Sequence, residues 1–231
     1  MDAIILAGGK GTRMKPLTTR LPKALIELHG QPILAHVLDG LAGAGVKRVV
    51  IVIGHRGAQV RNALGPEYKK MKLEYVVQKK LNGTAKAFGL GKKFLHEPFL
   101  AGHCDVIAPS ALWKKLAAKK RCLAVMAVRA DPNPEKFGVV TVQKGWAAEI
   151  VEKPVVPKSR WVNAGCYRFS PRIFGFIART KKNPLRGEFE LTDTLRMLIA
   201  KKKLGVVSFD GPVYDIGSPP DLYEAEIRTG T

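Results

Sequence analysis

The stretch that decides the fold is Leu6-Ala-Gly-Gly-Lys-Gly-Thr-Arg-Met-Lys-Pro-Leu-Thr18, in which an apolar run passes directly into glycines and then into cations. The apolar residues at 3–7 predict a buried strand. The glycines let consecutive backbone N–H groups turn inward as an anion nest, and the cations supply countercharge for a polyphosphate. The segment therefore predicts a phosphate-binding loop directly after the first strand. Its cations are Lys10, Arg13 and Lys15.

Two familiar phosphate-loop patterns do not fit this segment. No G-x-x-x-x-G-K-[ST] can be laid on it, and the dinucleotide-binding fingerprint meets Met14 where it requires a third glycine. A mobile glycine turn with solvated lysines is the alternative interpretation, and this segment alone leaves it open.

Working outward, the first half of the chain alternates apolar runs with helical periodicity, which is typical of βα units around a mainly parallel sheet. Gly43 and Gly45 follow the first predicted helix and would end it. After the strand at 3–7, the predicted strands cover residues 49–53, 73–77 and 99–104, and the predicted helices cover residues 33–41, 58–64, 84–95 and 110–119.

The pattern loosens from Cys122 onward, where Pro-, Asn- and Gly-rich loops separate the strands and little helix intervenes. This region predicts an antiparallel or mixed addition to the sheet. Ser218 and Asp221 have capping-box spacing with proline between them, which predicts the start of a closing helix. The other elements predicted here are strands at 123–128, 139–142, 149–151, 162–169 and 206–209 and helices at 171–179 and 190–201.

Composition narrows the class of protein. The chain has 231 residues, 46% of them hydrophobic, which suffices for a sizeable core, and its 39 Lys and Arg against 19 Asp and Glu give a net charge of +20. That charge suggests an anionic partner, yet the cations occur as dispersed pairs rather than as one basic and aromatic motif, so we expect no specific nucleic-acid partner. We expect most of them to be solvated surface groups.

Membrane, secretory and disulfide-rich classes are not supported either. The longest apolar runs, such as 49–53, are far shorter than the roughly 20 residues that span a bilayer. The cysteines, Cys104, Cys122 and Cys166, are odd in number and lack C-x-x-C spacing, which favours a reduced, cytoplasmic protein. The histidines are scattered without metal-ligand spacing, and we interpret them as surface or core residues. They are His29, His36, His55, His96 and His103.

The opening string, followed at Leu21 by L-P-K-A-L-I-E-L-H-G-Q-P-I-L, resembles the signature of the sugar-1-phosphate nucleotidyltransferases, which make nucleotide sugars such as dTDP-glucose and UDP-glucose. Further segments recur in the family's order and cover nearly the whole chain. They are 78–88 (Q-K-K-L-N-G-T-A-K-A-F), Asp105, 137–140 (F-G-V-V), 150–154 (I-V-E-K-P), 162–165 (V-N-A-G), 188–193 (E-F-E-L-T-D) and 214–219 (Y-D-I-G-S-P).

The resemblance implies an α/β fold of the nucleotide-diphospho-sugar transferase type. In this fold a Rossmann-like, mainly parallel sheet is flanked by helices, and a smaller mixed β insertion forms the sugar-binding half. Residues 1–231 then form one nucleotidyltransferase domain, with a nucleotide-binding half at 1–120 and a sugar-phosphate-binding half at 121–231. We expect no left-handed β-helix domain of the kind that some family members append, so acetyl transfer is not implied.

The chemistry of such a transfer can be stated independently of the family. A sugar 1-phosphate is already an anionic nucleophile, so its attack on the α-phosphorus of a nucleoside triphosphate needs positioning, cations and a metal more than acid or base help. Mg²⁺ prefers one or two carboxylates together with phosphate oxygens and water. Such a reaction does not need a catalytic triad, and aspartates are the expected metal ligands.

Two aspartates match the metal ligands of the family. Asp105 follows the predicted strand at 99–104, at the carboxyl edge where open α/β sheets bind ligands. Asp215 matches the second ligand, in Y-D-I-G-S-P. Without the resemblance, either could be an ordinary turn residue. One departure is that the family usually has glycine immediately before the first aspartate, where this chain has Cys104.

The resemblance also assigns the residues that contact phosphates and the base. Arg13 matches the arginine associated with the leaving pyrophosphate, and its fork of donors suits that role. Lys23 and Lys153 match two phosphate-contacting lysines. Gln78 and Gly83 match the residues that read a pyrimidine, the first with its amide and the second by close backbone approach. The implied nucleotide-binding set is Leu6, Ala7, Gly8, Gly9, Gly11, Thr12, Arg13, Lys23, Gln78, Gly83, Thr84 and Asp105.

The implied sugar pocket carries a carboxylate and an amide that can hydrogen-bond hydroxyls. An ion pair with a surface lysine is the alternative for its glutamate. The set is Gly138, Glu152, Lys153, Asn163 and Gly165. We predict Mg²⁺-dependent transfer of a nucleotidyl group, from UTP or dTTP, to a sugar 1-phosphate. A cytidylyl- or guanylyltransferase and a non-catalytic regulatory homologue stay open, as do homo-oligomers.

Overall fold

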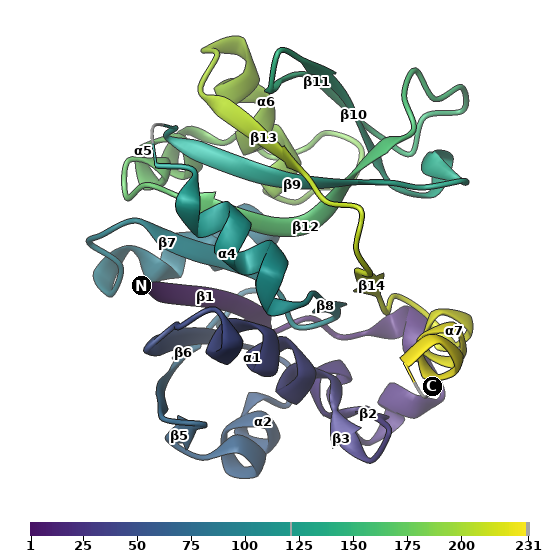
Figure 1. The fold of residues 1–231 in the computed structure, drawn as a ribbon. Helices are drawn as coiled ribbons and strands as arrows, with labels where there is room; N and C mark the ends of the chain where they lie inside the picture. Colours follow the sequence, from purple (N-terminus) through teal and green to yellow (C-terminus); the bar gives the residue numbers. More distant parts are fainter. Residues whose placement is uncertain (121, 230–231) are drawn as a thin grey trace.

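The computed structural model describes residues 1–120 and 122–229. Its main feature is one mixed sheet of 10 strands in the order β10-β11-β13-β9-β12-β7-β1-β4-β6-β5. Strands of the first half of the chain occupy one end of this sheet, and strands of the second half occupy the other (Figure 1). The chain is therefore an α/β fold.

The first half supplies the parallel part of the sheet. Strand β1 (Asp2–Ala7) pairs in parallel with β4 (Arg48–Ile53) and with β7 (Phe99–His103), and β4 pairs in parallel with β6 (Met71–Val77). Strands β1, β4 and β7 are largely apolar and buried, as expected where helices cover both faces, whereas β6 is only partly buried. Their carboxyl ends share one edge, and the loops that carry Gly8 and Asp105 leave from it. A short antiparallel strand, β5 (Glu67–Tyr68), ends the sheet on this side.

The second half continues the same sheet with mainly antiparallel strands. Strand β12 (Trp161–Phe169) pairs antiparallel with both β7 and β9 (Ala124–Ala130). Strand β13 (Leu204–Ser208) is parallel to β9, whereas β10 (Gly138–Gln143) and β11 (Trp146–Glu152) form an antiparallel pair. A further pairing of β10 with β12 curls this end of the sheet. The mixed pairing predicted from the loosened pattern is confirmed.

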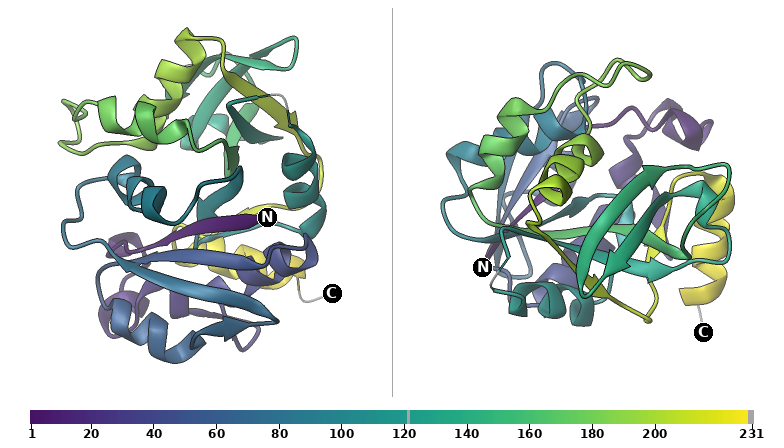
Figure 2. Two further views of the ribbon diagram at one scale, coloured as in Figure 1. Left: turned by 90° about the vertical axis from the view of Figure 1, so that its left-hand side faces the viewer. Right: turned by 90° about the horizontal axis from the view of Figure 1, so that it is seen from above.

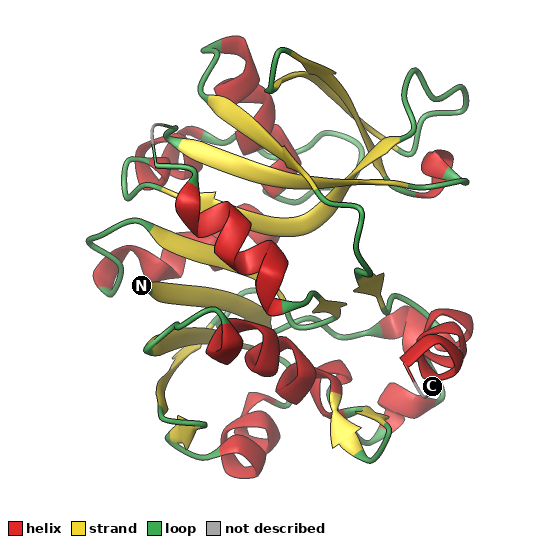
Figure 3. Ribbon diagram, in the orientation of Figure 1, coloured by secondary structure: helices red, strands yellow, loops and turns green. Residues whose placement is uncertain are grey.

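Helices pack on both faces of the sheet, so each face has its own core (Figures 2 and 3). On one face lie α1 (Ile33–Gly43) and α4 (Ser110–Ala118), which contributes the fully buried Trp113. On the other face lie α3 (Thr84–Gly89), α5 (Ile173–Arg179) and α6 (Leu191–Ala200). Helix α2 (Gly57–Leu64) follows β4. In the described residues, every helix is too short or too polar to cross a bilayer.

The C-terminal segment returns to the first half of the chain. Strand β14 (Tyr214–Asp215) pairs with β8 (Val106–Ile107), and α7 (Pro219–Thr229) follows. A separate apolar cluster joins this segment to the loops after β1 (Figure 1). The cluster is Met14, Ile26, Leu28, Ile33, Ile216, Leu222 and Ala225. The last segment of the chain thus packs on residues of the first half.

Local structure departs from the sequence predictions in several places. The helix predicted at 84–95 ends as α3 at Gly89 and continues as a 3₁₀ turn over Leu90–Lys93. A two-strand hairpin, β2 (Glu27–Leu28) with β3 (Gln31–Pro32), was not predicted, because such short strands show no periodicity. Helix α7 begins after Ser218 as predicted, but the Ser218 hydroxyl donates to the Asp221 carboxylate, 2.6 Å away, instead of forming the reciprocal backbone contacts of a capping box.

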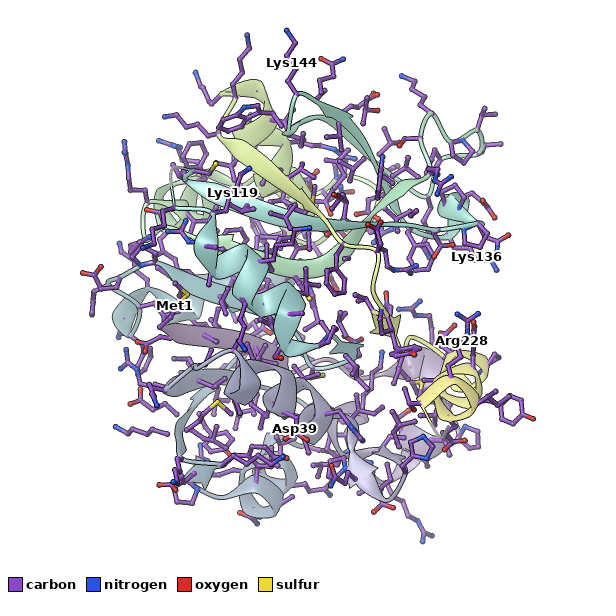
Figure 4. All side chains as sticks on the ribbon, in the orientation of Figure 1. Met1, Asp39, Lys119, Lys136, Lys144 and Arg228 are labelled. Carbon is purple, nitrogen blue, oxygen red and sulfur yellow. The ribbon has the colours of Figure 1, made fainter. Side chains whose placement is uncertain are left out.

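Basic side chains are spread over the surface. Lys119 lies at the end of α4, Lys136 near the start of β10 and Lys144 in the turn between β10 and β11, on separate parts of the molecule (Figure 4). This spread fits the expectation that most of the charge is a general surface property.

Candidate active site

The glycine-rich loop after β1 is held by close backbone packing. A Cβ on Gly8 would lie 3.2 Å from the backbone N of Gly54, so the loop sits directly against the end of β4. Gly11 has φ +62°, and a Cβ there would lie 2.9 Å from Thr18 Cγ2. A side chain at Gly11 would therefore be strained, and one at Gly8 would fit tightly against the end of β4. Gly9 differs, because nothing lies within 4 Å of its Cβ position and the residue is exposed.

The first cavity opens over this loop and has a volume of about 570 Å³, within the range of roughly 300–1,000 Å³ that is usual for small-molecule sites. All of the residues predicted to bind the nucleotide line it. They are Leu6, Ala7, Gly8, Gly9, Gly11, Thr12, Arg13, Lys23, Gln78, Gly83, Thr84 and Asp105. Residues that are distant along the chain thus face one space.

The far wall of this cavity is a loop fixed by the second half of the chain. Gln78 Nε2 lies 3.4 Å from the backbone O of Gly83. Gly83 has φ +116°, and a Cβ there would collide with the backbone of Phe189. The backbone N of Ala85 donates to the Phe189 O at 2.9 Å, and the backbone N of Leu191 donates to Thr84 Oγ1 at 2.9 Å. The fold therefore requires glycine at position 83 whether or not a base lies beside it.

The second cavity adjoins the first and has a volume of about 920 Å³. It is lined by all of the predicted sugar-site residues and by the second predicted metal ligand. They are Gly138, Glu152, Lys153, Asn163, Gly165 and Asp215.

Hydrogen bonds from neighbouring strands and helices hold the polar groups of this second cavity. Thr192 Oγ1 donates to Glu152 Oε1 at 2.6 Å. Asn163 Nδ2 donates to the hydroxyl of Tyr167 at 2.8 Å, and the Gly165 backbone N donates to Asn163 Oδ1 at 3.1 Å. Gly165 lies in an irregular stretch of β12 and has φ +70°. Such a bulge re-aims side chains, here toward the cavity.

Lys153 has a backbone conformation that is rare for a residue with a side chain. Its φ is +45°, and its backbone N donates to the Phe137 O at 2.9 Å. Its side chain is exposed at the rim of the second cavity. Left-handed backbone at a non-glycine residue is costly and concentrates at functional sites.

The two cavities meet at a shared boundary lined by Arg13, Thr84, His103, Asp105 and Gly217. At this boundary Lys23 Nζ donates to Asp105 Oδ2 at 2.5 Å. Burial raises the pKa of the Asp105 carboxyl, but the Lys23 ammonium and then His103 lower it, and the net pKa lies below the ordinary value. Asp105 is thus ionised, and Lys23 rests on the carboxylate.

The second aspartate reaches the boundary through the returning C-terminal segment. Strand β14 pairs Asp215 with Val106, and the Ile216 backbone N donates to the Asp105 O at 2.9 Å. The Asp215 side chain is open to the cleft, yet the surrounding protein removes much of its water. This burial, and then the negative charge of Asp105, raise the pKa of Asp215 to about 6, although Lys23 and Arg13 lower it.

The boundary fits a hard divalent cation. Asp215 accepts no hydrogen bond or ion pair from any side chain in the part of the chain that the structure describes, and its carboxylate repels that of Asp105. A cation near both carboxylates would relieve that repulsion. The described residues contain no cluster of three or more His, Cys, Asp or Glu that could hold a metal. Two carboxylates with open positions suit Mg²⁺, which keeps water and phosphate ligands, better than they suit zinc.

Several lining residues were not predicted. His103 was interpreted as a surface or core residue, but it lines both cavities. Burial lowers the pKa of its imidazole, which is the largest effect on it. The sequence could have indicated His103 as a site residue through its position at the end of a predicted strand, two residues before Asp105. The other polar residues not predicted at the site are Cys104 and Glu188 in the first cavity and Lys136, Tyr167, Arg186, Glu190, Thr192 and Asp221 in the second; Lys10, predicted as a loop cation, lines the first cavity.

Comparisons with known proteins agree with this architecture. The family model described as "Nucleotidyl transferase" matches residues 2–230. The "Bifunctional protein GlmU" of Methanocaldococcus jannaschii is 35% identical over 97% of this chain, but the match covers only 53% of that protein, so this chain spans about half the length of such relatives. The "UTP--glucose-1-phosphate uridylyltransferase AglF" of Haloferax volcanii is 32% identical, over 99% of this chain and 96% of that protein.

Solved structures extend the comparison to three dimensions. A crystal structure described as a glucose-1-phosphate thymidylyltransferase from Bacillus anthracis superposes with a TM-score of 0.89 at 28% identity, covering 99% of this chain and 94% of that one. A UDP-glucose pyrophosphorylase in complex with UDP-glucose superposes with a TM-score of 0.87 at 26% identity, covering 98% of this chain and 97% of that one.

Proposed function

Because the chain belongs to the nucleotidyltransferase family, whose model it matches over residues 2–230, we propose that it transfers a nucleotidyl group from UTP or dTTP to a sugar 1-phosphate and releases pyrophosphate. The observation that carries this proposal is the pair of adjoining cavities, one over a glycine loop and one over a hydroxyl-binding set, with the aspartates at their boundary. Such a reaction needs two substrates whose phosphates meet at one point.

The first cavity is suited to the nucleoside triphosphate. Its loop presents backbone N–H groups, which bind phosphate oxygens, and the exposed Arg13 supplies a planar fork of donors for the departing pyrophosphate. Gln78, on the far wall, can pair with the edge of a pyrimidine through its side-chain amide. Together these groups hold the triphosphate with its α-phosphorus toward the boundary.

The second cavity is suited to the sugar phosphate. Glu152 keeps one carboxylate oxygen for sugar hydroxyls, because its other oxygen accepts from Thr192. The exposed ammonium of Lys153 at the rim can bind the sugar phosphate. Lys23, which rests on Asp105, lies where it could instead contact a phosphate that enters the boundary. These side chains orient the attacking phosphate oxygen.

Asp105 and Asp215 would hold the Mg²⁺ ion. When bound, the ion supplies charge neutralisation and alignment of phosphates. The two carboxylates create the negative potential that attracts a cation to the boundary, while the nearby Lys23 and Arg13 keep the net charge low enough for polyanionic substrates to enter.

A substrate panel tests the proposal. Pyrophosphate release is measured with UTP, dTTP, CTP, GTP and ATP against glucose, galactose, mannose and N-acetylglucosamine 1-phosphates, with Mg²⁺ and with chelator. We expect UTP or dTTP to be used well ahead of the purine nucleotides, and Gln78→Ala to erode that preference by roughly 1–3 kcal/mol. Release that is equal for purines and pyrimidines would contradict the base assignment. No release from any pair would contradict the proposed function.

A further inference from the structure

His103 has a large side chain at the boundary of the two cavities, and this side chain has no role in the proposed reaction so far. Among the boundary residues, Arg13 and Asp105 have proposed roles toward phosphate and metal, and Gly217 has no side chain. Thr84 already accepts a hydrogen bond from the Leu191 backbone N through its hydroxyl. His103 ends strand β7 and is partly exposed to the cleft.

The imidazole ring of His103 is held in place on two sides. It packs edge-on against the ring of Phe88, with centroids 5.7 Å apart and an interplanar angle of 80°. On the other side is the bulge of β12, where a Cβ on Gly165 would lie 3.8 Å from His103 Cδ2. Gly165 lines the second cavity only, so the ring faces the sugar side of the boundary.

The polar atoms of this ring are free to meet a ligand. Within residues 1–120 and 122–229, no side chain or backbone group forms a hydrogen bond with either ring nitrogen. A polar ring that packs against an aromatic side chain and a glycine, with both nitrogens free of hydrogen bonds to the described residues, is suited to binding a ligand.

We propose that the His103 imidazole hydrogen-bonds the substituent at C2 of the sugar 1-phosphate and so helps to select the sugar. The inference rests on the proposed function. The anomeric carbon carries the phosphate that must reach Asp105, two residues from His103, so the part of the sugar at the boundary is C1 with its neighbours. The hydroxyl at C2 is the nearest one to that carbon, and an imidazole can donate to it or accept from it.

The test compares substrates that differ by one hydroxyl. We measure kcat and KM with UTP and either glucose 1-phosphate or 2-deoxyglucose 1-phosphate, for the wild type and for His103→Phe, which keeps a planar ring against Phe88. The wild type should prefer glucose 1-phosphate by about tenfold or more, since a site built to bond a hydroxyl rejects the analogue that lacks it. His103→Phe should lose that preference.

Two controls separate recognition from structural damage. 6-Deoxyglucose 1-phosphate lacks a hydroxyl far from C1, so His103→Phe should impair its use as much as that of glucose 1-phosphate. His103→Gln, which retains a donor and an acceptor, should recover part of the preference. Equal losses with glucose and 2-deoxyglucose 1-phosphates, or a wild type that does not distinguish them, would overturn the inference and leave the proposed function standing. A wild type that releases pyrophosphate with no sugar phosphate would overturn the proposed function itself.

Discussion

The two cavities are built in different ways. The nucleotide cavity takes one wall from a single continuous segment, residues 6–13, in which Gly8 packs against the backbone of Gly54. The sugar cavity takes its polar groups from separate strands and helices, and side-chain hydrogen bonds such as that of Thr192 to Glu152 hold them in place. In the proposed reaction the nucleotide phosphates, which are common to every nucleotide, would meet backbone groups. The variable sugar would meet side chains, which can change without disturbing the backbone.

The boundary belongs to both cavities, and substitutions there should have the largest effect. Asp105→Asn and Asp215→Asn should each lower pyrophosphate release by about a hundredfold or more, because losing an anionic metal ligand in a partly water-excluded site costs on the order of 3 kcal/mol. The measurement is the rate of pyrophosphate release over a range of Mg²⁺ concentrations.

The matched control for these variants is Asp210→Asn. Asp210 is an exposed carboxylate just before the returning strand and lines neither cavity, so its variant should keep normal activity. Asp105→Asn should also lower the midpoint of thermal unfolding, because it removes the partner of the largely buried Lys23. Asp215→Asn should not, since it removes a like-charge repulsion. A double variant with near-normal turnover would contradict the metal assignment.

Substitutions at Gly11 and Gly9 distinguish an effect on the stability of the fold from an effect on nucleotide binding. Gly11→Ala should destabilise the protein by more than about 1 kcal/mol, because its backbone is left-handed and its Cβ would press on Thr18. Gly9→Ala should leave the free energy of unfolding within about 0.5 kcal/mol, since its Cβ position is open. The added methyl group should nevertheless raise KM for UTP by about tenfold with kcat little changed, because it occupies the place of a phosphate. If Gly9→Ala bound UTP normally, the backbone cradle would not be the phosphate site.

The smallest expected effect concerns the hydrogen bond that orients Glu152. Thr192→Val keeps the side-chain shape but removes the hydroxyl donor, at a cost of about 1 kcal/mol. KM for the sugar 1-phosphate should therefore rise by about fivefold. KM for the nucleotide should not change, and Thr141→Val, on the neighbouring strand β10 and outside both cavities, should change neither. Equal increases in the KM for the nucleotide and the KM for the sugar 1-phosphate would mean that Thr192 does not act on the sugar cavity alone.

This contrast also explains how far the sequence could predict the molecule. The periodicity of the longer strands and helices predicted the parallel half of the sheet and its mixed continuation. The continuous segment from Leu6 to Arg13 predicted a phosphate loop from its own residues, with a mobile glycine turn left open, whereas the sugar-site residues were accessible only through the family resemblance. His103 and Thr192 were not predicted as site residues, because their roles depend on contacts with other helices and strands, which the sequence does not show. The pairing of β14 with β8 was missed because two-residue strands show no alternation.

The return of the C-terminal segment has a consequence for protein synthesis. Residues 214–225 supply both Asp215 and the apolar side chains that cover Met14, Ile26 and Leu28. Translation proceeds from the N-terminus, so the glycine loop and the parallel strands of the first half are available for folding well before this cover arrives. Until residues 214–225 pack in place, the nascent chain lacks the Asp215 carboxylate. The apolar side chains of Met14, Ile26 and Leu28, near the glycine loop, also lack their cover. Residues 214–225 therefore add the second carboxylate and the apolar cover to a scaffold whose glycine loop and parallel strands come earlier in the chain.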